Sequence, residues 1–370
     1  MGTWKASVLL TFLVMESTTW GAGDNLKGPA YHPARALAMG DAYIAQADDG
    51  ASALMYNPAM LGKLRRFEFE MENIQLEANS DFVERASTKM VTFPSLAAFA
   101  PTLAGRSFWA PGAGGSYFPN VSTRGFGAGV LFQSRVWGQN KNGTLRYRST
   151  FQMIPTAGVA LRLASGVVKV GYSFQWINKA QGDQTVGWSE AQGWFDRVNS
   201  GHAFSHTGAF SLNIPRTYLP SINIVARNIG GTKYKSGGLA VVATNVTGQP
   251  ETDPMMIDVG LGIGPRLSGS VTSTINLDYR DVTAQTGVFL LTKASAGLEL
   301  AINQTVYLRA GYGAGYPSAG LGIHGHSGRL SFAWWSEELS TSIWSERDNR
   351  FMVQYQFKIY SGKSEKKRNE

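Results

Sequence analysis

Residues 125–132 read Gly-Phe-Gly-Ala-Gly-Val-Leu-Phe, with glycine at 125, 127 and 129 and Phe126, Ala128, Val130 and Phe132 at the positions between. The same two-residue period recurs in 168–176 and 271–280, where apolar side chains alternate with small or polar ones. Successive side chains of a β-strand point to opposite faces, so each segment predicts a strand with one apolar face. Such strands suit a wall with lipid on one side and a polar interior on the other.

The composition favours one membrane barrel over a helical membrane protein. Only 16% of the 370 residues are charged, yet the mean hydropathy of -0.14 is too polar for a chain of apolar helices. In a transmembrane barrel only half of each strand has to be apolar. No linker or change of composition divides the chain, so we expect one large domain.

The first 23 residues predict a signal peptide. Lys5 is followed by the apolar run 6–15 and then by small and polar residues up to Gly23. The run is too short to cross a bilayer as a helix. The absence of cysteine excludes disulfides and thiolate metal sites, and it fits an exported protein. The expected organisation is a signal peptide at 1–23, a hatch or plug at 24–65, a barrel at 66–360 and a polar tail at 361–370.

The net charge of +8 does not predict nucleic-acid binding, because the basic residues are scattered except for a cluster in the C-terminal tail. A solvated tail explains that cluster, which is interrupted by Glu365. Nucleic acid is therefore not an expected partner.

Fourteen apolar or alternating segments are predicted as strands: 66–77, 88–100, 123–138, 144–164, 165–181, 203–216, 220–232, 254–267, 270–282, 291–302, 304–315, 318–325, 328–336 and 349–359. Short links alternate with longer ones, as in outer-membrane barrels. Two places break this alternation, since 101–122 is long and 316–317 is short, so twelve to sixteen strands stay open. Aromatic residues near segment ends, including Trp137, Trp176, Trp334 and Trp335, are expected in interfacial girdles.

The predicted fold class is all-β, a transmembrane antiparallel β-barrel of about 14 strands in the outer membrane of a Gram-negative-type bacterium. A soluble β-sandwich is the alternative. The segment 34–64 before the first strand is dense in alanine and glycine and contains Asn57, Pro58 and Ala59. Small residues let a backbone pack tightly against a wall, so we predict that this segment plugs the lumen.

These residues resemble the N-terminal signature of the outer-membrane long-chain fatty-acid transporter superfamily (FadL-like), which includes PorV-like barrels. The matching blocks are Ala-Arg-Ala-x-x-Met-Gly-x-Ala at 34–42, Ala-Asp-Asp at 47–49 and Asn-Pro-Ala at 57–59, and segments 278–281, 297–299, 308–312, 318–322 and 332–334 resemble the closing strands. The resemblance implies a luminal hatch with Asn57, Pro58 and Ala59 as hatch residues. It implies uptake of hydrophobic or amphipathic small molecules such as long-chain fatty acids.

For PorV-like members, the resemblance implies docking of cargo or secretion-complex proteins instead. The chain departs from the family pattern because it lacks large external lobes, and because a polar tail follows its last strand. The partners expected in either case are outer-membrane lipid together with a hydrophobic ligand or a protein.

Charged residues of both signs lie on the inward faces of the later predicted strands, namely Asp278, Arg280, Glu299 and Arg309. Opposed side chains on neighbouring strands are about 5 Å apart, so these residues predict a polar network in the lumen. Bracing of the barrel or hatch is favoured over substrate binding, because structural ion networks are common.

The long link 182–202 carries Trp188, Trp194 and Phe195 among polar residues. It is a candidate external surface for a ligand or a partner, and an aromatic lid packed on its own barrel is the alternative. The sequence contains no nucleophile elbow, nucleotide loop or His-Glu-x-x-His motif. We therefore expect no enzyme activity, cofactor or metal site.

Overall fold

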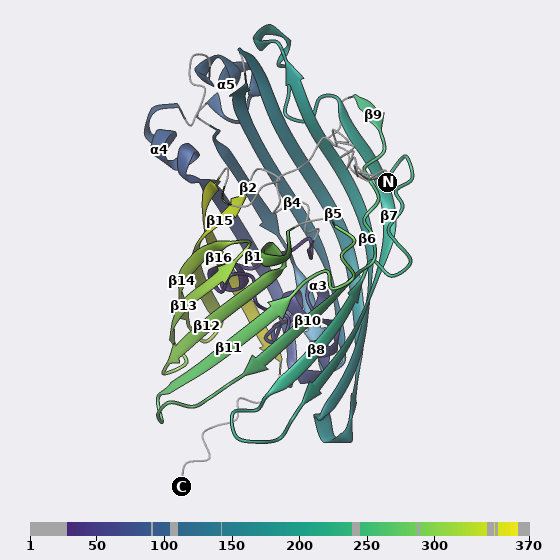
Figure 1. Ribbon diagram of the computed structural model, residues 1–370, viewed down its shortest axis with the longest axis vertical. Coiled ribbons are helices and arrows are strands. Elements are labelled where there is room, and N and C mark those ends of the chain that lie inside the picture. Colours follow the sequence, from purple (N-terminus) through teal and green to yellow (C-terminus); the bar gives the residue numbers. More distant parts are fainter. Residues whose placement is uncertain are drawn as a thin grey trace, which may run out of the picture.

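The computed structural model describes residues 28–89, 92–103, 110–141, 143–238, 245–286, 289–338, 344 and 347–361. Within these ranges an antiparallel sheet closes on itself, because β1 (Phe67–Asn79) pairs with β16 (Arg347–Ser361) along its whole length (Figure 1). With β2 and β3 counted as one interrupted strand and the short β9 left out, fourteen described strands surround the lumen. Closure leaves no unpaired edge in the wall.

The other wall strands follow in chain order: β2 (Gly112–Tyr117), β3 (Asn120–Thr123), β4 (Phe126–Lys141), β5 (Thr144–Leu163), β6 (Val168–Val186), β7 (Val198–Asn213), β8 (Ser221–Arg227), β10 (Met256–Ile263), β11 (Val271–Tyr279), β12 (Ala294–Ile302), β13 (Val306–Gly313), β14 (Tyr316–His324) and β15 (Gly328–Glu338). β9 (Val246–Gly248) pairs with the start of β7 in parallel. The helices are α2 (Ala34–Ala38), α3 (Gly50–Met55), η1 (Pro58–Lys63), α4 (Ser80–Lys89), α5 (Leu96–Leu103), η3 (Ala164–Gly166), η4 (Trp188–Glu190) and η5 (Leu290–Lys293).

The predicted strand at 88–100 is wrong, whereas every other predicted strand has a counterpart in the barrel. The chain forms α5 there, since its leucines and alanines favour helix and its buried residues recur at helical spacing: Leu96, Phe99, Ala100 and Leu103. The missing strand is β2 together with β3, which lie in the link that had seemed too long. The glycine-rich β2 lacks the apolar residues by which a strand is identified.

The wall is much taller on one side than on the other (Figure 1). The tall wall is made of β4 to β7, which have 16 to 20 residues each. The short wall is made of β8 and β10 to β14, which have 7 to 9 residues each. At about 3.3 Å per residue and a tilt of about 40°, β5 rises about 50 Å and β12 about 23 Å.

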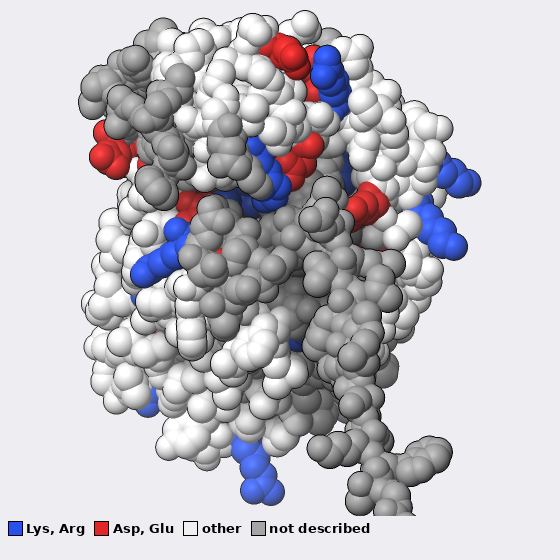
Figure 2. Space-filling model, turned by 45° about the horizontal axis from the view of Figure 1, so that its top comes forward, with Lys and Arg blue, Asp and Glu red and all other residues white. Residues whose placement is uncertain are grey.

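The outer face of the wall is apolar and the inner face is polar. Leu161, Leu277 and Leu308 are 68%, 52% and 45% exposed on the outside. Asp258, Asn276 and Gln354 lie at positions of the opposite face and are buried in the lumen. Figure 2 shows mostly white atoms on the lower flank of the molecule, with most of the visible charged residues in the upper half of the view. This is the architecture of a transmembrane β-barrel.

Among the described residues, no helix combines the length and apolar character that a membrane-crossing helix requires.

Residues 28–64 lie inside the barrel, and we call them the luminal segment (Figure 1). Its core contains Tyr31, Tyr43 and Tyr56, none of which is exposed. Asp49 caps α3 by accepting a hydrogen bond from the Ser52 amide, and Asn57 likewise accepts from the Ala59 amide where η1 begins. The signal peptide predicted at 1–23 and most of the tail predicted at 361–370 lie outside the described residues.

A helical cap covers the upper outer face of the tall wall. It consists of α5 and residues 187–197, and it packs on Leu145, Tyr147 and Val186. Val136 and Tyr147 pack in one apolar cluster with the cap, so they face outward, and their strand neighbours Trp137 and Arg148 face the lumen. The outer apolar surface of the tall wall is therefore covered by the chain itself at this height.

Candidate functional site

Glu299 lies at the centre of a buried ion cluster between the wall and the luminal segment. Its carboxylate accepts hydrogen bonds from Arg35 Nε at 2.8 Å, Arg35 Nη2 at 2.7 Å and Arg309 Nε at 2.7 Å. Gln46 Nε2 donates a further bond at 2.9 Å, and Asp48 pairs with Arg35 at 2.7 Å. Glu299 and Arg309, two of the predicted inward residues, thus pair with each other, and Glu299 binds Arg35 on α2 of the luminal segment.

Asp278 and Arg280 hold the next part of the luminal segment. Asp278 Oδ2 accepts hydrogen bonds from the backbone amides of Tyr43 at 2.6 Å and Ile44 at 2.8 Å. Arg280 Nη1 pairs with Asp41 at 2.6 Å, and its Nη2 donates to the Asp41 carbonyl at 2.9 Å. All four residues of the predicted polar network therefore contact the luminal segment directly or through one ion pair.

Asn57, Pro58 and Ala59 lie against the tall wall at Gly171. A Cβ on Gly171 would lie 2.2 Å from the Ala59 nitrogen and 2.2 Å from the Pro58 carbonyl carbon. Asn57 donates to the Ile44 carbonyl at 3.0 Å and to Asn223 at 3.3 Å. The absence of a side chain at Gly171 thus allows a backbone-to-backbone contact that any larger residue at that position would prevent.

Sequence reasoning missed Arg227 and Asp258, which anchor the end of α3. Arg227 donates to the carbonyls of Met55 at 2.6 Å and Tyr56 at 2.7 Å, and it pairs with Asp258 at 2.6 Å. A cation at the carbonyl end of a helix satisfies groups that have no partner within the helix. The strands β8 and β10 are short and apolar, so only their alternation could have shown these residues to be inward.

Trp188, Trp194 and Phe195 belong to the helical cap and pack on the barrel. Trp194 is 7% exposed, contacts Phe99 and Tyr147, and donates through its indole nitrogen to the Phe93 carbonyl at 2.9 Å. Trp188 donates to the Gly143 carbonyl at 2.7 Å, and Phe195 lies against the Phe151 ring. The arrangement is that of an aromatic lid, and none of the three rings is fully exposed.

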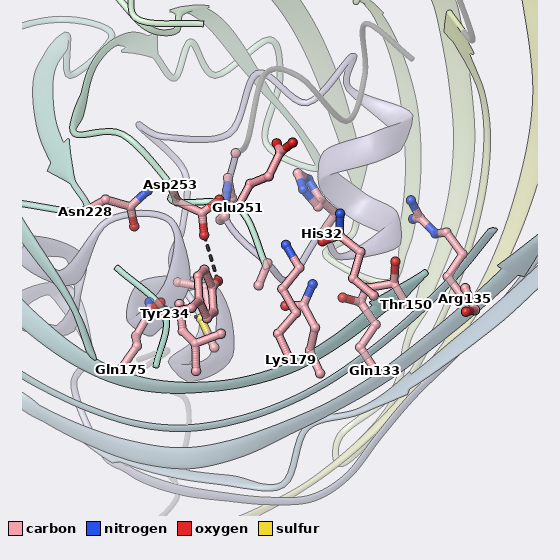
Figure 3. Close-up of a pocket in the computed structure, with 18 of the residues that line it drawn as sticks. His32, Gln133, Arg135, Thr150, Gln175, Lys179, Asn228, Tyr234, Glu251 and Asp253 are labelled. Atoms are coloured by element: carbon pink, nitrogen blue, oxygen red, sulfur yellow. Dashed lines mark hydrogen bonds between the residues drawn. The ribbon is translucent and has the colours of Figure 1, made fainter. Parts of the chain in front are cut away.

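A cavity of about 250 Å³ lies in the lumen beside the luminal segment, between the tall wall and Asn228, Tyr234, Glu251 and Asp253 (Figure 3). In this large cavity, Gln133, Arg135 and Lys179 point inward from the wall. Beside Lys179, the Tyr234 hydroxyl donates to Asp253 at 2.8 Å. Trp137 also lines the cavity, so the predicted girdle position of this residue is wrong.

A second cavity of about 140 Å³ adjoins the first on the side of the short wall. Leu37, Tyr316 and Trp335 give this small cavity an apolar surface, whereas Arg280, Lys293 and Glu337 supply charge. Trp335 is 5% exposed and faces inward, so its predicted place in the girdle is wrong too. Gly28, His32 and Arg135 line both cavities and therefore lie between them.

Asp41 connects His32, which lies between the two cavities, to the barrel wall. Its carboxylate accepts a hydrogen bond from the Tyr56 hydroxyl at 2.5 Å and lies 3.1 Å from His32 Nδ1. Burial acts to raise the pKa of Asp41, but the charges of Arg280 and His32 outweigh burial and hold that pKa well below its usual range.

We expect the folded protein to lose stability in acid through Asp41. Because its pKa is lower in the folded than in the unfolded state, its contribution is present above about pH 4 and is lost as the pH falls below that value. Thermal unfolding of the detergent-solubilised protein between pH 2 and pH 7 measures this loss. Asp41→Asn should remove part of the pH dependence, and asparagine tolerates the φ of 63° at this position. An identical pH profile in the variant would contradict the assignment.

No protein-family model matches this chain, and no curated protein matches it in sequence. Solved structures match it in architecture. The toluene transporter TodX of Pseudomonas putida has a TM-score of 0.49 and 11% identity, covering 92% of this chain and 100% of that one. The CymD monoaromatic hydrocarbon channel has a TM-score of 0.49 and 10% identity, covering 92% and 99%. CdiB from Acinetobacter baumannii has a TM-score of 0.39 and 8% identity, covering 80% and 60%. At these TM-scores and identities, the matches carry no argument about the ligand of this chain.

Proposed function

We propose that this protein is an outer-membrane channel for the uptake of amphipathic small molecules, in the manner of FadL-like barrels. The observation that carries the proposal is the pair of adjoining cavities in the lumen. The large cavity is lined by charged and amide side chains, and the small cavity presents Leu37, Tyr316 and Trp335. The polar head of an amphipathic ligand would bind in the large cavity and its apolar body in the small one. Ligand sites in proteins commonly combine apolar walls with a few polar groups in this way.

The barrel itself supports a place in the outer membrane of a Gram-negative-type bacterium. Closed antiparallel barrels with an apolar outer band are the β-structures that span such membranes. The luminal segment contacts both walls beside the cavities, so passage to the other side requires part of this segment to move. The segment 28–64 is therefore proposed to act as a hatch, with Asn57, Pro58 and Ala59 at its contact with β6.

Docking of cargo or secretion-complex proteins has less support. The aromatic residues that were candidates for a docking surface pack on the barrel, with Trp194 only 7% exposed. The cavities, by contrast, offer a site for a small molecule. We therefore retain uptake as the function.

We expect a brominated long-chain fatty acid to quench the fluorescence of the purified protein through Trp335. Bromine quenches an indole at close contact, and Trp335 lines the small cavity. Trp335→Phe should remove the share of the saturable quenching that comes from the small cavity and leave the share from Trp137 in the large cavity, whereas Trp344→Phe, at a residue that is 61% exposed, should leave the quenching intact. Titration in detergent with each variant measures the effect. Equal saturable quenching in the two variants would place the ligand elsewhere.

Uptake in cells tests the transport step. A labelled long-chain fatty acid should enter cells that express the protein faster than cells in which the gene is deleted. Equal uptake by the two kinds of cell would contradict the proposed channel function. Recovery of stoichiometric protein partners after purification in mild detergent would favour docking instead.

A further inference from the structure

The loop between β11 and β12 carries an exposed apolar patch on the rim of the short wall. We call it the rim patch, and its members are 50–65% exposed: Val282, Phe289, Leu290 and Leu291. The sequence between Asp281 and Lys293 contains no charged residue. Contiguous exposed apolar residues of this kind mark surfaces that contact a membrane or a protein.

The rim patch is held in place by hydrogen bonds at the base of its loop. The Asp281 carboxylate accepts from the backbone amides of Gln285 at 2.9 Å and Thr286 at 3.0 Å. It also pairs with Lys293 at 2.9 Å, across the two ends of the loop. The described part of the loop is therefore ordered by its own polar groups, and its apolar side chains are left exposed.

The height of the short wall places the rim patch at the edge of the membrane. β11 and β12 have nine residues each. At about 3.3 Å per residue and a tilt of about 40°, these strands rise about 23 Å, close to the apolar band of about 25 Å on outer-membrane barrels. Residues just beyond the strand ends consequently lie where the hydrocarbon ends.

The outer faces of these strands continue the apolar surface up to the loop. Leu277 on β11 is 52% exposed, and Leu298 on β12 is 37% exposed. Their Cα atoms lie on adjoining strands, since Leu298 pairs with Ile275 in the ladder. The rim patch therefore extends the lipid-facing surface of the barrel without a charged break.

We propose that the rim patch inserts into the adjoining leaflet of the membrane and is covered there by lipid acyl chains. A short wall whose strands barely match the hydrocarbon thickness gains contact with lipid from an apolar rim. Thr292 and Lys293 of the same loop line the small cavity. The element that contacts lipid on one side thus forms part of the cavity wall on the other.

Site-directed spin labelling tests this placement, because the chain has no cysteine and a single introduced thiol is unique. The test variant is Leu290→Cys. Leu277→Cys on β11 is the lipid-facing control, and Val246→Cys on β9 beside the tall wall, at a residue that is 59% exposed, is the control for water. Each nitroxide-labelled protein is reconstituted in phosphatidylcholine vesicles, and its folding is checked by heat-modifiable migration in gels.

Molecular oxygen concentrates in hydrocarbon, whereas a nickel chelate stays in water. The ratio of the rates at which the two reagents collide with the nitroxide label therefore reports the depth of the label in the membrane. We expect the Leu290 label to follow the Leu277 label, with nickel collisions several-fold below those of the Val246 label. Nickel collisions equal to those of the Val246 label would overturn the proposal. Shielding of the Leu290 label from both reagents would also overturn it, because a protein surface would then cover the patch.

Discussion

Glu299→Gln should destabilise the folded barrel by about 3 kcal/mol or more, since removing one partner of a buried ion pair leaves a buried charge without compensation. Arg309 is the residue most affected, because it forms its ion pair with Glu299, whereas Arg35 keeps its ion pair with Asp48. The exposed fraction of the Glu299 side chain is 3%, so solvent cannot replace the lost carboxylate. Urea unfolding followed by tryptophan fluorescence measures the change.

Two further variants separate charge burial from a general loss of packing. Glu190→Gln removes a carboxylate from the exposed part of η4 and should change stability by less than about 0.5 kcal/mol. Glu299→Gln combined with Arg309→Met should recover part of the loss, since the second change removes the buried Arg309 charge that has lost its partner. If Glu299→Gln unfolds at the same urea concentration as Glu190→Gln, the ion cluster does not hold the luminal segment.

Gly311→Ala should displace the luminal segment from the short wall. A Cβ at this position would lie 2.1 Å from the Met39 carbonyl carbon and 2.2 Å from the Gly40 nitrogen, and both atoms are backbone. Because a backbone contact cannot be relieved by a rotamer change, we expect a cost of about 2 kcal/mol or more, at the upper end for overpacked sites. We also expect larger or more frequent conductance steps in planar bilayers, because the segment fills the lumen.

The matched control for Gly311→Ala is Gly208→Ala on β7. The nearest atom to a Cβ at Gly208 is the terminal carbon of Ile229 at 3.3 Å, a side chain that can move. This variant should leave both conductance and the unfolding midpoint close to those of the unaltered protein. Equal behaviour of the two variants would mean that the contact at Gly311 does not keep the lumen closed.

Period-two alternation predicted most of the barrel because each strand has to present apolar side chains to one face only. The rule fails at 88–100, where an apolar segment predicts a strand but its residues recur at helical spacing. It fails again at β2, where glycines leave no alternation to detect. Local pattern therefore sufficed for strands with large outward side chains and not for those without them.

The candidate site was predictable only in part. Alternation placed Asp278, Arg280, Glu299 and Arg309 on inward faces, but their partners Arg35 and Asp41 lie in a segment that has no strand period. Which residues of that segment meet the wall depends on how it folds within the lumen. The position of Trp335 near a segment end predicts a girdle residue, but Trp335 directly follows Trp334, and adjacent strand residues cannot both face outward.

The helical cap limits how far the barrel can enter a bilayer. Leu145 and Tyr147 on the outside of β5 are already covered by the cap, so acyl chains cannot reach that height without removing it. The helical cap therefore sets an upper limit to the lipid-covered part of the tall wall, and so fixes the depth of the barrel in the bilayer. A thicker bilayer would have to thin around the protein, and such a mismatch costs fractions of a kcal/mol per ångström.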